Sequence, residues 1–195
     1  MNPIRIAAFA TAIFATGLGF AAFGSLAVNS ARAEMTVEVG GAPMYPSKNI
    51  VENAINSKDH TTLVAAVKAA GLVETLQGTG PFTVFAPVNK AFEKLPAGTV
   101  ETLLKPENKA TLVAVLGYHV LPGKYSAMDL MDAVKKSGGK AMMKSVEGEE
   151  LTLMMEGKKL EIIDAKGGKS IVTIADVNQK NGVIHVVDTV LLPKG

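Results

Sequence analysis

Three histidines are the residues with which this chain could carry out acid–base chemistry or bind a metal: His60, His119 and His185. The imidazole group titrates near neutral pH and is a common metal ligand. His119 and His185 lie in apolar stretches and could meet in the folded chain. Neither has an acidic residue or another histidine at the spacing of a metal site. We therefore predict that each satisfies a buried carbonyl or hydroxyl group, and that His60, beside a helix cap, is exposed.

Methionines form a second group with metal-binding chemistry, and six fall within 28 residues: Met128, Met131, Met142, Met143, Met154 and Met155. A hairpin that turns at residues 147–150 would place Met143 opposite Met154. Met142 would then lie opposite Met155, on the face that packs into the core. Paired thioethers can bind Cu(I), but no histidine is near in sequence. We therefore favour packing, or an adaptable contact surface, over copper binding.

The sequence lacks the motifs of several common catalytic and metal-binding sites. The sequence has no phosphate loop, no G-x-S-x-G elbow, no H-E-x-x-H and no EF-hand loop. Three glutamates cluster in one turn, Glu147, Glu149 and Glu150, and we interpret them as a charged hairpin tip rather than a cation site. The chain has no cysteine, which excludes disulfides and thiolate chemistry. The sequence predicts no catalytic residue, no cofactor, no metal and no enzymatic activity.

Charge gives no support for a nucleic-acid partner. The formal net charge of +2 comes from 20 Lys+Arg against 18 Asp+Glu. The only arginines are Arg5 and Arg32, so the charges of the chain from Glu34 onward cancel. Arginine is the residue best suited to reading phosphates and base edges. Its absence from that part of the chain also excludes an Arg-Gly-Asp motif there.

Residues 1–33 have the layout of a signal peptide. Arg5 precedes an apolar stretch, which ends at the A-x-A pattern of residues 31–33. Cleavage between Ala33 and Glu34 is expected, with export to the periplasm or the extracellular medium. The alternative is an uncleaved anchor, since about 20 apolar residues can span a bilayer. Contact with a membrane is expected only in that case.

The pattern after the signal peptide predicts an α+β domain. Residues 34–48 are expected to be an irregular lead-in, followed by one domain over residues 49–195. Helical periodicity dominates the first half, and a buried strand is expected near residues 82–86. The second half has the shorter period of strands separated by turn residues. The predicted strands are residues 141–146, 151–155, 160–164, 170–177 and 183–192. This order predicts helices packed on a mostly antiparallel β-sandwich or wedge.

Three stretches of the sequence resemble the fasciclin-like domain family, and its bacterial exported single-domain proteins in particular. They are residues 83–92, the pair Tyr118-His119, and residues 181–193. The resemblance implies a compact α+β fold and marks these signature residues: Thr83, Phe85, Pro87, Asn89, Phe92, Tyr118, His119, Gly182, His185 and Asp188.

The signature residues have structural explanations that require no catalysis. Pro87 can end a strand without a ladder hydrogen bond. The Asn89 side chain can bond to backbone. Gly182 is expected at a turn position of positive φ, and Asp188 is expected to bond back to the first signature stretch. The family usually has a small polar residue at Val88, so no side-chain cap is predicted for the helix that follows.

The resemblance implies a non-catalytic module that contacts a polysaccharide or protein of the cell surface or matrix. A single domain gives one weak contact, so firm adhesion requires several copies. The alternative is a periplasmic binding protein for a small molecule or lipid, which requires a concave apolar pocket. A scaffold protein without a ligand is a third possibility. The sequence leaves the oligomeric state open.

Overall fold

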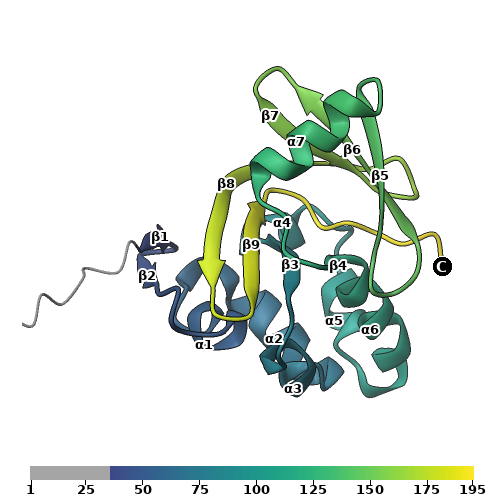
Figure 1. Ribbon diagram of the computed structural model, residues 1–195. Coiled ribbons are helices and arrows are strands. Elements are labelled where there is room, and N and C mark those ends of the chain that lie inside the picture. The colour runs from purple at the N-terminus through teal and green to yellow at the C-terminus, as the bar shows by residue number, and fades with distance from the viewer. Residues whose placement is uncertain (1–35) are drawn as a thin grey trace, which may run out of the picture. The chain divides into compact units, whose positions relative to one another are not determined.

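The computed structural model describes residues 36–195. The expected signal peptide and its cleavage site at Ala33 and Glu34 lie outside the described residues. Figure 1 shows helices gathered at one end of a curved sheet, with one further helix across the other end. In the described part of the chain, no helix is long and apolar enough to cross a membrane.

The described chain begins with a short hairpin rather than the irregular lead-in expected for residues 34–48. Strand β1 (Val37–Val39) pairs antiparallel with β2 (Ala42–Met44). Gly40 and Gly41 form the turn with φ of 61° and 73°, values that glycine adopts without steric cost. Val39 and Met44 pack into the core.

Helices fill the first half of the domain, as predicted. Helix α1 begins with a capping box, in which Asn49 Oδ1 accepts from the Glu52 N–H at 2.9 Å. Helix α2 ends at Gly71, which has φ of 74°. The helices of the described residues are α1 (Ile50–Ala54), η1 (Lys58–His60), α2 (Thr61–Ala70), α3 (Val73–Gln77), α4 (Asn89–Glu93), α5 (Thr99–Leu103), η2 (Pro106–Asn108), α6 (Lys109–Tyr118) and α7 (Ala127–Lys136).

One seven-stranded sheet has the order β4-β3-β9-β8-β7-β6-β5. Every neighbouring pair is antiparallel except β3 and β9, which run parallel. This confirms the α+β fold with a mostly antiparallel second half. The strands are β3 (Phe82–Pro87), β4 (Val120–Pro122), β5 (Lys140–Lys144), β6 (Glu150–Glu156), β7 (Lys159–Ile163), β8 (Lys169–Gln179) and β9 (Gly182–Val187).

Two apolar clusters hold most of the core. The first joins α1, α2, α3 and α6 to β3, β8 and β9, and includes Leu63, Val84 and Ile184. The second lies between α7 and the curved sheet, and includes Phe85 and Leu151. Figure 1 shows α7 across β6 and β7, away from the helical end. Burial of these side chains is the main favourable contribution to folding.

The methionine hairpin has a different register from the one expected. Met143 lies opposite Leu151, and Met142 lies opposite Thr152. The turn is displaced because both the N–H and the hydroxyl of Ser145 donate to the Glu149 carbonyl. A shift by an odd number of residues exchanges the two faces of a strand. Met143 therefore packs against the core, while Met142, expected in the core, is 65% exposed.

The closing strand is also shorter than the expected 183–192. Strand β9 ends at Val187, bends follow at Asp188 and Thr189, and the remaining residues belong to neither a helix nor a strand. The N–H groups of Leu191 and Leu192 donate to side chains, to His119 Nε2 and Asp164 Oδ2 respectively. Buried backbone groups must find partners, and here side chains supply them in place of a strand.

Glycine is required at position 182 because a larger side chain would not fit there, and not because of its backbone conformation. Gly182 is absent from the residues of positive φ, contrary to the expectation for this turn. A Cβ built at Gly182 would overlap the carbonyl of Phe82, its neighbour across the β3–β9 ladder. Because Gly182 and Phe82 both belong to the ladder, their backbones have little freedom to move apart and relieve the overlap.

We expect Gly182→Ala to lower the free energy of unfolding by about 1–3 kcal/mol, the usual cost of overpacking. The control is Gly117→Ala within α6, where a Cβ would meet only the Glu147 side chain closely. Alanine is favoured over glycine in a helix, so this control should lie within about 1 kcal/mol of the parent protein. Urea unfolding measures both. Equal stability of Gly182→Ala and the parent would contradict the steric explanation.

Candidate functional site

The signature residues meet around the parallel pair β3 and β9. Phe85 lies opposite His185 in this ladder, and their ring centroids are 5.9 Å apart. Both side chains are fully buried. Pro87 closes β3 opposite Val187, and Phe92 from α4 packs partly buried against the core. The first and third signature stretches are thus side by side in the folded chain.

His119 holds the C-terminal segment against α6. Its Nδ1 lies 2.7 Å from the Val115 carbonyl, and its Nε2 lies 2.9 Å from the Leu191 N–H. Nδ1 must therefore donate and Nε2 must accept, which is the neutral ring. Burial lowers the pKa of His119 to about 4. Both ring nitrogens are in use, so this imidazole has no free atom for proton transfer or metal binding.

His185 plays a similar part on the other side of the sheet. Its Nε2 lies 3.0 Å from the Tyr125 carbonyl, and its Nδ1 accepts from the Asp176 N–H at 3.3 Å. Burial lowers its pKa, and the Tyr125 carbonyl offsets part of that effect. His119 and His185 do not share a site. These contacts match the prediction that each ring satisfies buried backbone groups.

Tyr118 and Thr83 each join two segments through one hydroxyl. The Tyr118 hydroxyl donates to the Glu150 carbonyl and accepts from the Ala165 N–H, both at 2.9 Å. Burial raises the pKa of Tyr118 to about 12. The Thr83 hydroxyl donates to the Gly123 carbonyl at 2.8 Å and accepts a further backbone N–H.

Asn89 bonds to a distant part of the chain instead of its own turn. Its Oδ1 accepts from the Thr62 N–H at 3.0 Å, and its Nδ2 donates to the Lys58 carbonyl at 2.8 Å. Helix α4 is thereby fixed to the junction of η1 and α2. Val88 caps α4 without a side-chain hydrogen bond, as its departure from the family pattern predicts.

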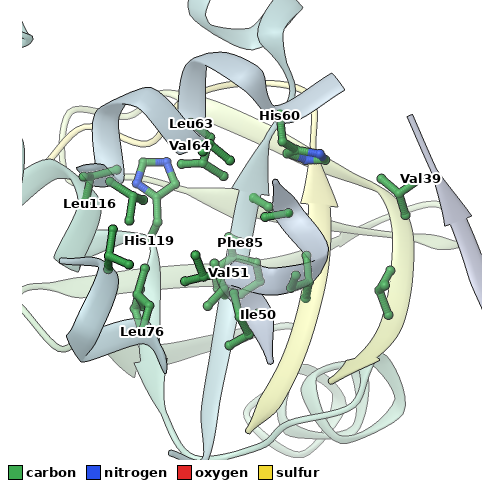
Figure 2. Close-up of a pocket in the computed structure, with 18 of the residues that line it drawn as sticks. Val39, Ile50, Val51, His60, Leu63, Val64, Leu76, Phe85, Leu116 and His119 are labelled. Carbon is green, nitrogen blue, oxygen red and sulfur yellow. The ribbon is translucent and has the colours of Figure 1, made fainter. Parts of the chain in front are cut away.

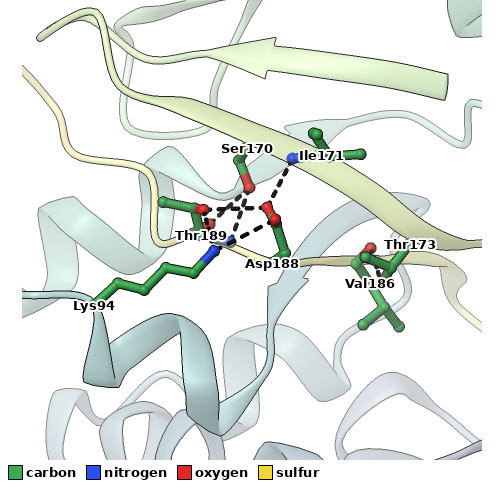
Figure 3. A network of polar contacts seen from close by, with 7 residues as sticks. All are labelled: Lys94, Ser170, Ile171, Thr173, Val186, Asp188 and Thr189. Carbon is green, nitrogen blue, oxygen red and sulfur yellow. Dashed lines mark hydrogen bonds and ion pairs between the residues drawn. The ribbon is translucent and has the colours of Figure 1, made fainter. Parts of the chain in front are cut away.

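Asp188 is the centre of a polar network on a partly exposed surface (Figure 3). Its Oδ1 accepts from the Ile171 N–H at 2.9 Å and from the Thr189 hydroxyl at 3.1 Å. Its Oδ2 lies 3.3 Å from Lys94 Nζ. Burial raises the pKa of this carboxyl, but the hydrogen bonds and the lysine charge outweigh burial and lower it. Lys94 follows α4 and lies beyond residues 83–92, so the side chain of Asp188 bonds next to the first signature stretch and not to that stretch itself, which was the expectation.

Two features of the helical end escaped the sequence analysis. Asn181 makes three hydrogen bonds to two segments: Oδ1 accepts from the Ile50 N–H of α1 at 3.1 Å, and Nδ2 donates to the Leu76 and Gly78 carbonyls at the end of α3. His60 is 3% exposed, not exposed as expected. It lines an apolar cavity beside α1 and α2 (Figure 2). Only the Asn-Gly turn signal at Asn181 was visible in the sequence.

No group of three His, Cys, Asp or Glu side chains among residues 36–195 is placed to hold a metal ion. The Cu(I) alternative loses its predicted geometry, because Met154 lies opposite Lys140 rather than Met143.

A contact face lies on the outer side of the edge strand. Lys140, Met142 and Lys144 alternate along β5 and share one face, and all three are exposed. Across the ladder, Thr152 and Met154 of β6 continue this face. We call these five residues the β5–β6 outer face. Methionine side chains adapt to different partners, and lysines discourage pairing of an edge strand with another sheet.

The β5–β6 outer face contains one of the large exposed apolar side chains of the described chain. The others lie on α7, after α1 and in the hairpin turn: Met128, Ile55 and Val146. The outer face therefore combines apolar area with charge of both signs, because the exposed Glu150 lies opposite Lys144 on it. This combination suits a partner of mixed polarity better than a wholly apolar one.

His119 makes stability depend on pH. Its pKa is about 4 in the folded chain and about 6.5 when unfolded. Between these values the unfolded chain binds a proton that the folded chain does not, so stability falls as pH falls. The full difference is about 3 kcal/mol at 1.36 kcal/mol per pKa unit.

We expect His119→Gln to be less stable at pH 7 but to lose less of its remaining stability between pH 6.5 and pH 4. Urea unfolding at several pH values measures both chains. His60 and His185 are buried in both proteins, so their contributions to the pH dependence cancel when the two proteins are compared. Identical pH slopes for the two chains would contradict a low pKa for His119.

Comparisons with known proteins agree with the family resemblance. The family model described as Fasciclin domain matches residues 58–193. The chain is 46% identical over 191 residues to Protein sll1483 of Synechocystis sp., covering 97% of this chain and 96% of that protein. It is 37% identical over 134 residues to transforming growth factor-beta-induced protein ig-h3 of Sus scrofa, covering 67% of this chain and 17% of that protein.

A solved structure has the same fold. It is the FAS1 domain pair of the insect cell adhesion molecule Fasciclin I, with a TM-score of 0.67 and 22% sequence identity. The match covers 76% of this chain and 52% of that chain.

Proposed function

The chain belongs to the fasciclin domain family, and from that premise we propose that it is an exported module for contact with the cell surface or matrix. The family is one of non-catalytic adhesion modules, so the prediction that the chain is not an enzyme is confirmed. The ligand of this module is a polysaccharide or protein. The periplasm or the extracellular medium is its place of action, reached through the signal peptide of residues 1–33.

The observation that carries this proposal is the recurrence of the domain in two settings. The match to this chain covers 96% of one relative and 17% of another. A unit that occurs both nearly alone and as one part of a longer chain behaves as a module. The same fold is found in an insect cell adhesion molecule. These facts support contact with another molecule as the task of the domain.

The use of the signature residues also supports a contact function. Their polar groups are taken up by hydrogen bonds between segments of the domain, as described for His119, Asn89 and Asp188. Groups used in this way stabilise the fold and are not available to a ligand. Binding then falls to surface residues, of which the β5–β6 outer face is our candidate.

We expect Met142→Ala to weaken binding to envelope material about tenfold, or about 1.4 kcal/mol, if this side chain is a central contact. The purified protein is immobilised, and its binding to the polysaccharide, protein and lipid fractions of its own organism's cell envelope is measured. Ile55→Ala is the matched control, because Ile55 is also large, apolar and 51% exposed but lies after α1.

The proposal predicts saturable binding of the polysaccharide or protein fraction, reduced by Met142→Ala and not by Ile55→Ala. Equal binding by the two variants would show that the β5–β6 outer face is not the binding site. Saturable binding of the lipid fraction alone, or none at all, would overturn the contact function. Both variants change exposed side chains, so their melting temperatures should equal that of the parent.

A further inference from the structure

An open groove is lined by helix α7, by the segment before it and by strand β5. Its volume is about 440 Å³, which falls in the range of roughly 300–1,000 Å³ that is usual for small-molecule sites. Its apolar side chains are those of Leu130, Ala133 and Met143. Met142 belongs to the opposite face of β5, because neighbouring residues of a strand face opposite sides. The groove and the β5–β6 outer face are therefore separate surfaces.

The segment of residues 123–127, which connects β4 to α7, is held by two of the signature residues. The Thr83 hydroxyl of β3 donates to the Gly123 carbonyl at 2.8 Å and accepts from the Tyr125 N–H at 2.9 Å. His185 Nε2 of β9 lies 3.0 Å from the Tyr125 carbonyl. Both backbone groups of Tyr125 are thus bonded to buried side chains. The fold therefore fixes the position of this residue.

Asp176 of β8 fixes the end of the same segment. Its Oδ1 accepts from the Ala127 N–H at 2.7 Å. Asp176 is the only residue other than glycine with positive φ among residues 36–195, with φ of 57°. This left-handed conformation costs free energy for a residue with a side chain. The fold retains it at the position that holds the start of α7.

The side chains of this fixed segment have no partners of their own. In the part of the chain that the structure describes, neither Lys124 nor the Tyr125 hydroxyl forms a hydrogen bond or an ion pair. The Tyr125 ring packs against Gly123, where a Cβ would lie 2.9 Å from the ring carbon Cε2. Both Lys124 and Tyr125 line the groove. A group whose position is fixed in advance loses less entropy when it binds a ligand.

The charged side chains of the groove cancel one another. Lys124 and Lys136 supply two positive charges, and Asp129 and Asp132 supply two negative ones. Asp129 caps α7 by accepting from Ser126 through Oδ2, which leaves Oδ1 as an acceptor. Carboxylates accept hydrogen bonds and ammonium groups donate them. The groove therefore suits an uncharged ligand with several groups that donate and accept.

We propose that this groove binds one ring of a neutral saccharide. A sugar ring has C–H faces of low polarity and an edge of hydroxyl groups that both donate and accept. Tyr125 likewise combines an apolar ring with a polar tip, and the aspartates and lysines pair with the sugar hydroxyls. A peptide docks by pairing with a strand edge or by placing apolar anchors in a groove. It fits less well here, because the charged side chains lie on α7 and the segment before it.

This inference goes beyond the proposed contact function and does not depend on it. The test is titration of glucose, mannose, galactose and N-acetylglucosamine into the ¹⁵N-labelled protein. At least one sugar should shift the amide resonances of α7 and of residues 123–127 in a saturable manner. Glucuronate has the ring of glucose with one negative charge, and it should bind no more tightly than glucose. A tetra-alanine peptide blocked at both ends should cause no such shift.

Tyr125→Phe tests the role of the hydroxyl. The affinity for the bound sugar should fall at least about threefold, which is within the usual contribution of one hydrogen bond. The matched control is Tyr45→Phe, because Tyr45 is also half-buried and its hydroxyl is also without a partner in the described chain. Tyr45 follows the N-terminal hairpin and does not line the groove. Neither change should alter the melting temperature.

The sugar titration is independent of the envelope-binding experiment. Met142→Ala should bind the sugar as the parent protein does, so failure of the outer face and failure of the groove are separate results. No saturable shift with any of the four sugars, or saturable binding of the peptide alone, would overturn the saccharide site. Tenfold tighter binding of glucuronate than of glucose would overturn the preference for a neutral ligand. Equal sugar affinity of Tyr125→Phe and the parent protein would overturn the role of the Tyr125 hydroxyl.

Discussion

The parallel pairing of β3 with β9 is the constraint on which the rest of the structure depends. It joins Phe82 to Gly182 and Pro87 to Val187, across nearly the whole domain. Every residue of β9 is buried, so the pair has apolar packing on both faces. Closing so long a loop costs chain entropy, which the two apolar clusters and the ladder must offset. Glycine at position 182 is what allows the two backbones to approach.

Polar side chains hold other segments onto this pair. His119 fixes the C-terminal segment, Asn89 fixes α4 to α2, and Asp188 fixes the start of β8 to the end of β9. Burial keeps His119 neutral at pH 7, so that one ring nitrogen donates while the other accepts. Histidine, asparagine and aspartate side chains are often associated with catalysis, but here they hold segments of the fold together. In the proposed function, recognition of a partner falls to the surface of the domain.

The parts of the fold set by local interactions could be predicted from the sequence. The caps at Asn49 and Ser126 are contained within one helical turn, and the helix stop at Gly71 is a matter of its own φ. The α+β class followed from the change of hydrophobic period. The resemblance of three short stretches then indicated the family.

The features that could not be predicted from the sequence depend on contacts between distant segments. The register of the methionine hairpin is set by Ser145 bonding to Glu149, which no periodicity reveals. His60 is buried although its neighbours Asp59 and Thr61 are exposed. The need for Gly182 comes from Phe82, a residue on another strand. The apolar cavity beside His60 is invisible in the sequence for the same reason, since its wall is assembled from the N-terminal hairpin, several helices and strands β3, β4, β8 and β9.

The central claim is that the signature residues build the fold and leave binding to the surface. Asn89→Ala tests this most directly, because it removes the hydrogen bonds that fix α4 to the junction of η1 and α2. Melting temperature and envelope binding would be measured on the same sample, with binding tested well below the melting point. The account predicts a lower melting temperature with unchanged affinity. Loss of binding at an unchanged melting temperature would contradict it.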